Sequence, residues 1–410
     1  MTERLYYEDP YLTRFTAHTL EHLQWEGHPA VVLDRTAFYP TGGGQPNDTG
    51  FLRDARTLEE VPVVDVAERE SDGAVVHVLT APLQADEVEG QIDWDHRFDL
   101  MQQHTGQHLL SAAFLERFDA NTVGFHLSDD YSTIDLDRAP LSAQDLTGVE
   151  ALANAIVFEN LQAVARFVPD EEVPELPLRK ALAHQGPVRV VEIPDFDCSA
   201  CGGTHVRATG GIGLIKITRS ERRGDETRVE FLCGGRALTD YAAKNRLVMD
   251  LAREFTVGHW EVADLVHRLA GDLKETQREL RRTRDALLDA EAVALWNGAA
   301  AVGEARIVRA HLADRPPDDL KHLAQRLVTH PQTVVLLAAG AAGQKGFLTF
   351  ARSPDLDVHM GTLVRQACET IGGRGGGRSE FAQGGGPQGD RVPLALDTAF
   401  QSVVDSLPHG

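Results

Sequence analysis

The sequence predicts an α+β protein in which a small N-terminal β-barrel, an α+β domain, a helical connector and a C-terminal α/β domain follow one another. Its length of 410 residues exceeds one typical domain of about 100 to 200 residues. Short β-branched runs give way to helical periodicity near residue 93, and a heptad-like stretch precedes a final region of mixed helices and strands. We expect the units to be 1–90, 91–237, 238–300 and 301–410.

The N-terminal unit is predicted from the apolar runs AVVLD, VPVVDV and AVVHVL, which Pro, Gly and Asp interrupt. Such short, interrupted runs are typical of antiparallel strands in a small barrel. The segment YPTGGGQPNDTG, residues 39–50, is its most distinctive loop, and its composition alone is that of a wide hairpin loop.

The second unit begins with a predicted helix over 93–118, where apolar residues and histidines recur every three to four residues. A strand in STIDLD, a second helix over 145–161, and strands in VRVVEI, GLIKITRSERR and TRVEFLCG follow. Helices and strands mixed in this order predict an α+β domain.

The connector is predicted to be helical with a break near FTVGHW, residues 255–260. Its second half has a seam at alternating spacings of three and four residues, which indicates a coiled coil or a helical hairpin. A homodimer through this connector or through the C-terminal domain is an open alternative. The seam consists of Val266, Leu269, Leu273, Thr276, Leu280, Thr283, Leu287, Ala290 and Ala294.

The last unit reads as helix, strand, strand, helix, a glycine-rich run and a final helix, which predicts a small α/β domain with an open sheet. The run GGRGGGRSEFAQGGGPQGD contains Arg374 and Arg378. Its backbone N–H groups could approach phosphates closely, or it could be a flexible surface loop.

Composition excludes several classes of protein. The chain is 42% hydrophobic and 25% charged, with no apolar run near the roughly 18 residues of a membrane span. Its N-terminus lacks the basic start and apolar stretch of a secretory signal, so we expect a cytoplasmic location. The net charge of −22 disfavours binding of nucleic acid over the whole surface, so any such site must be local. The best local candidate is the basic cluster Lys216, Arg219, Arg222, Arg223 and Arg228.

Four cysteines in so long a chain do not form a disulfide framework, and clustered cysteines in a reducing compartment more often bind metal. His104 and His108 lie four residues apart in a predicted helix, so both emerge from one face and can converge on one ion. Such a pair alone is more often a polar helix face than a metal site, and it needs a second half.

The stretch DCSACGGTH, residues 197–205, offers that second half with two overlapping spacings. Cys198 and Cys201 form C-x-x-C, whereas Cys201 and His205 form C-x-x-x-H. The two glycines after Cys201 allow a tight loop that points the second pair inward. Either pair complements the histidines, and spacing alone does not choose between them.

The histidine helix lacks the glutamate of H-E-x-x-H, which disfavours a zinc protease, and no Ser-His-Asp arrangement surrounds a Gly-flanked serine. Catalysis would instead use a metal-activated water, with backbone N–H groups and hydroxyls stabilising the oxyanion of an ester under attack.

Taken together, HTGQH, CGGTH, GGGQPNDTG, VGFHLSDDYSTIDLD and GGRGGGRSEFAQGGG resemble the AlaX family of alanyl-tRNA editing proteins. These are freestanding relatives of the editing domain of alanyl-tRNA synthetase. The resemblance covers nearly the whole chain, including a C-terminal domain similar to the DHHA1 domain, and is therefore to the long form of the family.

The resemblance implies zinc-dependent hydrolysis of the ester in mischarged tRNA(Ala), chiefly Ser-tRNA(Ala) and secondarily Gly-tRNA(Ala), while Ala-tRNA(Ala) is spared. It implies one zinc ion per chain, with no ligand role for Cys198. The implied ligands are His104, His108, Cys201 and His205.

The resemblance also suggests pocket and tRNA contacts. Thr122 would hydrogen-bond the serine hydroxyl, although an ordinary strand threonine is an equal alternative, and Gln107 could face the same pocket. The resemblance makes Arg374 and Arg378 candidate tRNA contacts, and the basic cluster adds Arg222 and Arg223 as further candidates. Two rival functions stay open: a non-catalytic tRNA-binding protein in which four ligands enclose a structural zinc, and a zinc hydrolase of a small ester or amide.

Overall fold

The computed structural model describes residues 2–128, 130–180 and 186–407, and the chain divides into two compact units, Met1–His259 and Trp260–Gly410. This single division falls inside the predicted connector, so the domain boundaries at 90, 237 and 300 remain predictions. Within the described residues, no helix combines the length and apolar character that a membrane crossing requires.

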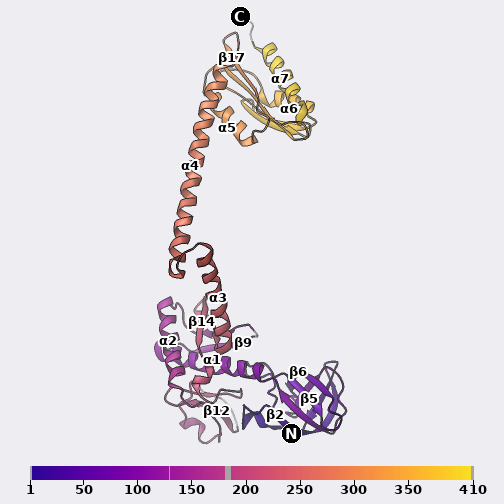
Figure 1. Ribbon diagram of the computed structural model, residues 1–410, viewed down its shortest axis with the longest axis vertical. Coiled ribbons are helices and arrows are strands. Elements are labelled where there is room, and N and C mark those ends of the chain that lie inside the picture. Colours follow the sequence, from indigo (N-terminus) through magenta and orange to yellow (C-terminus); the bar gives the residue numbers. More distant parts are fainter. Residues whose placement is uncertain (1, 129, 181–185, 408–410) are drawn as a thin grey trace. The chain divides into compact units, whose positions relative to one another are not determined.

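Six strands of the first unit close into an antiparallel barrel, in the order β2-β3-β7-β6-β5-β8 (Figure 1). The β-branched runs of the sequence fill its interior, where Val31, Val63 and Val75 are buried. The predicted N-terminal barrel is therefore confirmed. The strands are Arg14–Trp25 (β2), His28–Leu33 (β3), Gly50–Asp54 (β5), Glu60–Glu68 (β6), Val75–Leu79 (β7) and Glu87–Ile92 (β8), and the short strands Glu3–Arg4 (β1) and Arg35–Thr36 (β4) pair in parallel.

The rest of this unit contains the helices Trp94–Phe118 (α1), Ala143–Glu159 (α2) and Gly234–Glu254 (α3). One sheet has the order β14-β15-β10-β9 and a second has the order β11-β12-β13. The strands are Thr122–Leu127 (β9), Ser132–Leu136 (β10), Val164–Val168 (β11), Val188–Ile193 (β12), Asp197–Ala200 (β13), Ile215–Arg223 (β14) and Glu226–Cys233 (β15). Both sheets are antiparallel, so this part is α+β, as predicted.

Helix α1 is buried nearly all round, although its sequence is rich in polar residues. It contacts α2, α3 and strands of both sheets, and its polar side chains Gln102, Gln103 and Thr105 are buried. A buried polar group must be hydrogen-bonded, so these residues indicate a helix built to position polar groups. Gly106 shows how tight the packing is, because a Cβ there would lie 2.3 Å from Sγ of Cys233.

A six-stranded sheet forms the core of the second unit, in the order β16-β17-β18-β19-β21-β20. Alternate residues of β18 face opposite sides: Leu336 contacts the layer that includes α6 and α7, and Leu337 the layer that includes α4 and α5. The predicted C-terminal α/β domain is confirmed. The helices are Val262–Asn297 (α4), Pro317–Leu327 (α5), Met360–Thr370 (α6) and Val392–Ser406 (α7), and the strands are Ala300–Val302 (β16), Ala305–His311 (β17), Thr333–Ala339 (β18), Gly346–Arg352 (β19), Arg374–Gly377 (β20) and Phe381–Gly386 (β21).

The glycine-rich run forms the antiparallel hairpin β20-β21 at one edge of this sheet, so the flexible-loop interpretation is wrong. Helix α6 packs on the hairpin so closely that side chains do not fit. A Cβ on Gly384 would lie 2.3 Å from Sγ of Cys368, and one on Gly375 would lie 2.8 Å from the same atom. Most of the glycines here therefore serve packing.

Candidate metal centre and adjoining cavity

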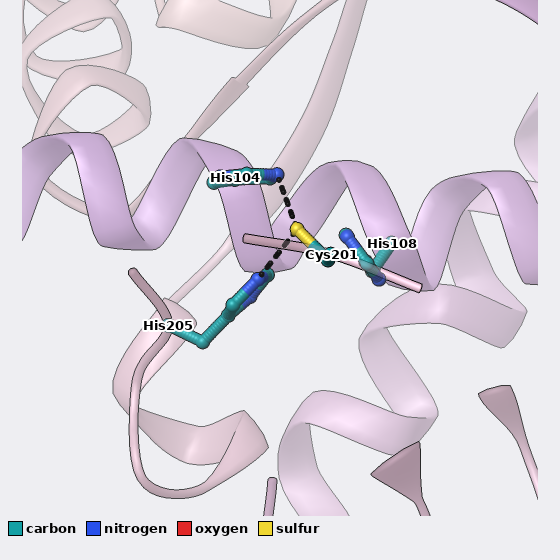
Figure 2. A group of neighbouring side chains, drawn as sticks. All are labelled: His104, His108, Cys201 and His205. Carbon is teal, nitrogen blue, oxygen red and sulfur yellow. Dashed lines mark hydrogen bonds between the residues drawn. The ribbon is translucent and has the colours of Figure 1, made fainter. Parts of the chain in front are cut away.

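Two segments bring four side chains together in the first unit. His104 and His108 come from α1, whereas Cys201 and His205 come from the loop after β13 (Figure 2). One ligand atom from each of the four lies within 4.8 Å of every other. Sγ of Cys201 is 3.4 Å from Nε2 of His104 and 3.3 Å from Nε2 of His205. Tetrahedral zinc, with Zn–S near 2.3 Å and Zn–N near 2.0 Å, would hold such atoms about 3.5 Å apart.

The second ring nitrogen of His104 is held by Gln45, from the glycine-rich barrel loop. Nδ1 of His104 lies 2.7 Å from Oε1 of Gln45. The amide orientation of Gln45 is fixed by Thr204, whose backbone N–H donates to Oε1 and whose hydroxyl accepts from Nε2. Because Oε1 can only accept, the proton of His104 resides on Nδ1 and the Nε2 lone pair faces Cys201.

The other two rings are held in the same way. Nδ1 of His205 lies 3.1 Å from Oγ1 of Thr105, whose own hydrogen is donated to the carbonyl of Met101. Nδ1 of His108 lies 3.0 Å from a carboxylate oxygen of Asp197. A metal-binding histidine typically donates its outer N–H to such an acceptor, which fixes the tautomer. The arrangement therefore fits a metal bound through Nε2.

The electrostatics also suit a cation. Burial raises the pKa of the Cys201 thiol, but the adjacent His104 and His205 imidazoles outweigh burial and hold the pKa well below its usual value. Burial lowers the pKa of His108, but the hydrogen bond to Asp197 and the Cys201 thiolate raise it to about 9. A thiolate among imidazoles is a donor set that zinc accepts.

Gly203 is required for a different reason from the one the sequence suggested. Neither Gly202 nor Gly203 is among the positive-φ glycines, so the loop does not need their conformational freedom. A Cβ on Gly203 would instead lie 2.2 Å from the His104 ring and 2.8 Å from Oε1 of Gln45. Gly203 thus leaves room for the His104–Gln45 contact.

Cys198 lies outside the cluster. Its side chain, on β13, packs in a small apolar group with Val168, Val188 and Val190. Burial raises the pKa of its thiol, the opposite of what is found for Cys201.

A cavity of about 670 Å³ adjoins the cluster. His104, His108 and Cys201 contribute to its wall, as do Gln107 and Thr122. Three of the four cluster residues and the proposed pocket residues therefore face one space.

A β-bulge directs Thr122 into this cavity. Gly124 pairs with Asp135 and Thr122 with Leu136, so Val123 is an extra residue in β9. In a regular strand, residues 122 and 125 would face opposite sides. Here Oγ1 of Thr122 is 2.6 Å from Oγ of Ser111 on α1, and Phe125 stacks on the His104 ring, also on α1.

Arg179 lines the same cavity and holds Asp197 in place. Its Nε donates to Oδ1 of Asp197 at 2.8 Å, and its guanidinium also donates to Ser199. Burial raises the pKa of Asp197, but the hydrogen bond from His108 and the charges of His108 and Arg179 lower it overall. Asp197 therefore stays ionised as the acceptor for His108.

The structure spreads the four arginines predicted to contact tRNA over both units. Arg222 and Arg223 lie exposed at the end of β14, where Arg223 pairs with Glu221. Arg374 and Arg378 are exposed on the hairpin β20-β21. The basic cluster is partly neutralised, because Lys216 pairs with Glu150 and Arg228 with Asp135.

Sequence reasoning missed several residues of the site, among them Gln45, Asp197 and Ser111. Ser111 could have been found, because it lies three residues after His108 on the same helix face. Gln45 and Asp197 act across the fold, and nothing in their local spacing links them to the histidines.

Three family descriptions match parts of the chain. The threonyl and alanyl tRNA synthetase second additional domain matches residues 188–230, the DHHA1 domain matches residues 305–405, and the class II (A) tRNA synthetases match residues 8–96. A solved structure, the C-Ala domain from Aquifex aeolicus alanyl-tRNA synthetase, is 26% identical and covers 26% of this chain and 96% of its own, with a TM-score of 0.24.

Curated relatives extend the match to the whole chain. The alanine–tRNA ligase of Thermococcus kodakarensis is 34% identical over 99% of this chain, which spans only 44% of that ligase. The ligase of Halorubrum lacusprofundi is 33% identical, and again 44% of it is spanned. The alanyl-tRNA editing protein AlaX-L of Pyrococcus horikoshii is 30% identical over 99% of this chain and 98% of its own length. On this full-length match, the chain belongs to the AlaX-L family of alanyl-tRNA editing proteins.

Proposed function

We propose that this chain is a trans-editing deacylase, which hydrolyses the ester of tRNA(Ala) mischarged with serine, and also with glycine, and spares Ala-tRNA(Ala). The relative that matches over its full length is an alanyl-tRNA editing protein, which supports this activity. The observation that carries the proposal is the cavity of about 670 Å³ whose wall includes His104, His108 and Cys201. A substrate in this cavity would meet the metal-binding side chains directly.

We propose zinc as the metal, held by Nε2 of the three histidines and by the Cys201 thiolate. Zinc bound there would supply Lewis acidity to the ester carbonyl or to an attacking water. The protein would supply the rest: Gln45, Thr105 and Asp197 orient the imidazoles, and the buried helix α1 keeps this arrangement rigid. Preorganised groups of this kind need no rearrangement during the reaction.

Thr122 and Gln107 would contact the amino-acid side of the ester, because both line the cavity beside the cluster. The tRNA body would be bound by exposed arginines, with Arg374 and Arg378 on phosphates and Arg222 and Arg223 as further contacts. A cytoplasmic location follows from this substrate, and a homodimer through the exposed apolar seam of α4 or through the C-terminal domain remains part of the proposal.

The decisive experiment is a deacylation assay with Ser-, Gly- and Ala-tRNA(Ala), with and without a chelator. We expect release of serine and glycine, little release of alanine, and loss of activity with the chelator that zinc restores. Zinc-loaded protein that releases no serine would instead support a structural zinc. Activity on small esters without dependence on tRNA would support the small-ester hydrolase.

A further inference from the structure

The wall of the cavity beside the cluster carries positive charge, although the chain as a whole is acidic. The sequence has 62 acidic and 40 basic residues. The described residues of the wall nevertheless include Arg179 and Lys180, and no aspartate or glutamate is among them. A cleft that presents charges of one sign attracts ligands of the opposite sign. This wall therefore favours an anionic ligand.

Arg179 is fixed in the wall by strand β13. Its Nε donates to Oδ1 of Asp197 at 2.8 Å, and its Nη2 donates to Oγ of Ser199 at 3.0 Å. The Asp197 carboxylate is buried, does not line the cavity and partly neutralises Arg179. Lys180 is the next residue, is exposed and lines the same cavity. Lys180 therefore supplies much of the positive charge that a ligand would meet.

The two cations and the proposed amino-acid contact Thr122 belong to different parts of the fold. Thr122 lies on β9, in the sheet β14-β15-β10-β9, whereas Arg179 is held by β13, in the sheet β11-β12-β13. His104 and His108 of the cluster come from α1 and line the cavity as well. One ligand in the cavity can therefore contact β9, the cluster and the cations through different groups.

We infer that Lys180, next to Arg179, binds the phosphate of the terminal nucleotide of the tRNA substrate. The inference rests on the proposed function, which it deepens. The ester joins the amino acid to the ribose of that nucleotide, and the phosphate on the 5′ oxygen of the same ribose is the nearest anion to the ester. With the amino acid toward Thr122 and the ester at the cluster, this phosphate is the group left for the cations. Lysine binds phosphate as a compact point charge.

The contact would hold the ribose, and with it the ester, in place beside the cluster. The phosphate takes no part in the breaking of the ester bond, so its contact with Lys180 is the same before and during hydrolysis. Such uniform binding lowers KM and leaves kcat nearly unchanged. Loss of Lys180 should therefore raise KM without slowing the chemical step.

The test removes one charge from each side of the contact in the full-length, zinc-loaded protein. The substrates are Ser-tRNA(Ala) and Ser-tRNA(Ala) in which an uncharged methylphosphonate replaces the phosphate between the last two nucleotides. Wild-type protein should lose about tenfold in kcat/KM on the uncharged substrate, mainly through a higher KM. Lys180→Ala should show this loss already on the natural substrate and lose little more on the uncharged one. Lys180→Arg should retain most of the wild-type difference.

Lys244→Ala is the matched control. Lys244 lies on α3 in the same unit, is exposed, and is not part of the cavity wall. This variant should keep the tenfold difference between the two substrates, and the zinc content should be equal in all variants. An equal fall in wild type and Lys180→Ala on the uncharged substrate, or no fall in wild type, would overturn the inference while leaving the proposed function intact. Wild-type protein that releases no serine from Ser-tRNA(Ala) would overturn the proposed function itself.

Discussion

In the two glycine-rich segments of this protein, the glycines make room for different neighbours. In the barrel loop, Gly44 lets the backbone approach Phe125, and the neighbouring Gln45 reaches His104 in the buried cluster. In the hairpin β20-β21, glycines such as Gly384 make room for α6, and the arginines lie exposed. A glycine run therefore indicates close approach, but only the fold shows whether the approaching group belongs to a site or to a core.

The largest effect on zinc binding and activity is expected in the cluster that the barrel loop supports. Cys201→Ala removes the only sulfur ligand of the cluster, so bound zinc should fall from one per chain to nearly none, and deacylation should be lost. Cys198→Ala is the matched control and should cost about 1 kcal/mol of stability without loss of zinc. Atomic absorption measures the zinc content of both variants. Equal loss of zinc in the two variants would indicate that Cys198 and Cys201, rather than Cys201 and His205, are the second pair of ligands.

The next effect concerns the hairpin, where glycine serves packing. A Cβ on Gly384 would lie 2.3 Å from Sγ of Cys368 and 2.7 Å from Cα of Gly375. We expect Gly384→Ala to destabilise the second unit by about 3 kcal/mol, as overpacking does. Gly376→Ala should change stability by less than about 1 kcal/mol, because a Cβ there meets nothing within 4 Å. Denaturant unfolding of the second unit measures its free energy of unfolding. Similar free energies for the two variants would show that Gly384 is not needed for packing.

Gln45→Ala measures how much the barrel loop contributes to the cluster. Loss of the acceptor for Nδ1 of His104 frees the ring to turn, and such changes typically weaken metal binding about 10- to 100-fold. Competition with a chromogenic chelator would determine the affinity. Thr41→Ala, an exposed position in the same loop, should retain wild-type affinity. Identical affinities for the two variants would show that the His104–Gln45 contact does not position the ligand.

The smallest effect is expected at the exposed arginines of the hairpin. Replacing Arg374 and Arg378 together by alanine should weaken tRNA binding and lower the salt dependence of log Kd by about one for each lost phosphate contact. Filter binding at several salt concentrations provides the slope, and Arg391→Ala, outside the hairpin strands, is a control for the loss of one positive charge elsewhere in the same unit. A slope that does not change would leave the hairpin with a packing role only.

Sequence periodicity predicted most of the fold, because barrel strands, the break between α3 and α4, and the alternating elements of the second unit all have local signatures. It could not predict that α1 is buried on all sides, since its polar residues are satisfied by partners far along the chain. The β-bulge at Val123 could not be predicted from the sequence either, because it depends on the pairing of β9 with β10.

The four side chains of the cluster were proposed from spacing and resemblance, and the structure brings them together. The sequence did not reveal the residues that orient these four side chains. Gln45 and Asp197 lie far from the histidines in sequence, and each acts through one hydrogen bond across the fold. Ser111 of the adjoining cavity was also missed, although its place on the histidine face of α1 could have been derived from its spacing.

Through the His104–Gln45 contact, the barrel would affect the binding of a metal by the cluster, although the barrel contributes no side chain to the cluster. The loop that carries Gln45 is tied to α1 by Arg97, which donates to Asp48 and to the carbonyl of Ala37. Any ion that binds the folded cluster more tightly than the unfolded chain stabilises everything the cluster requires. If zinc binds as proposed, the barrel and α1 should therefore unfold together, and the melting temperature of the barrel should rise with the zinc concentration.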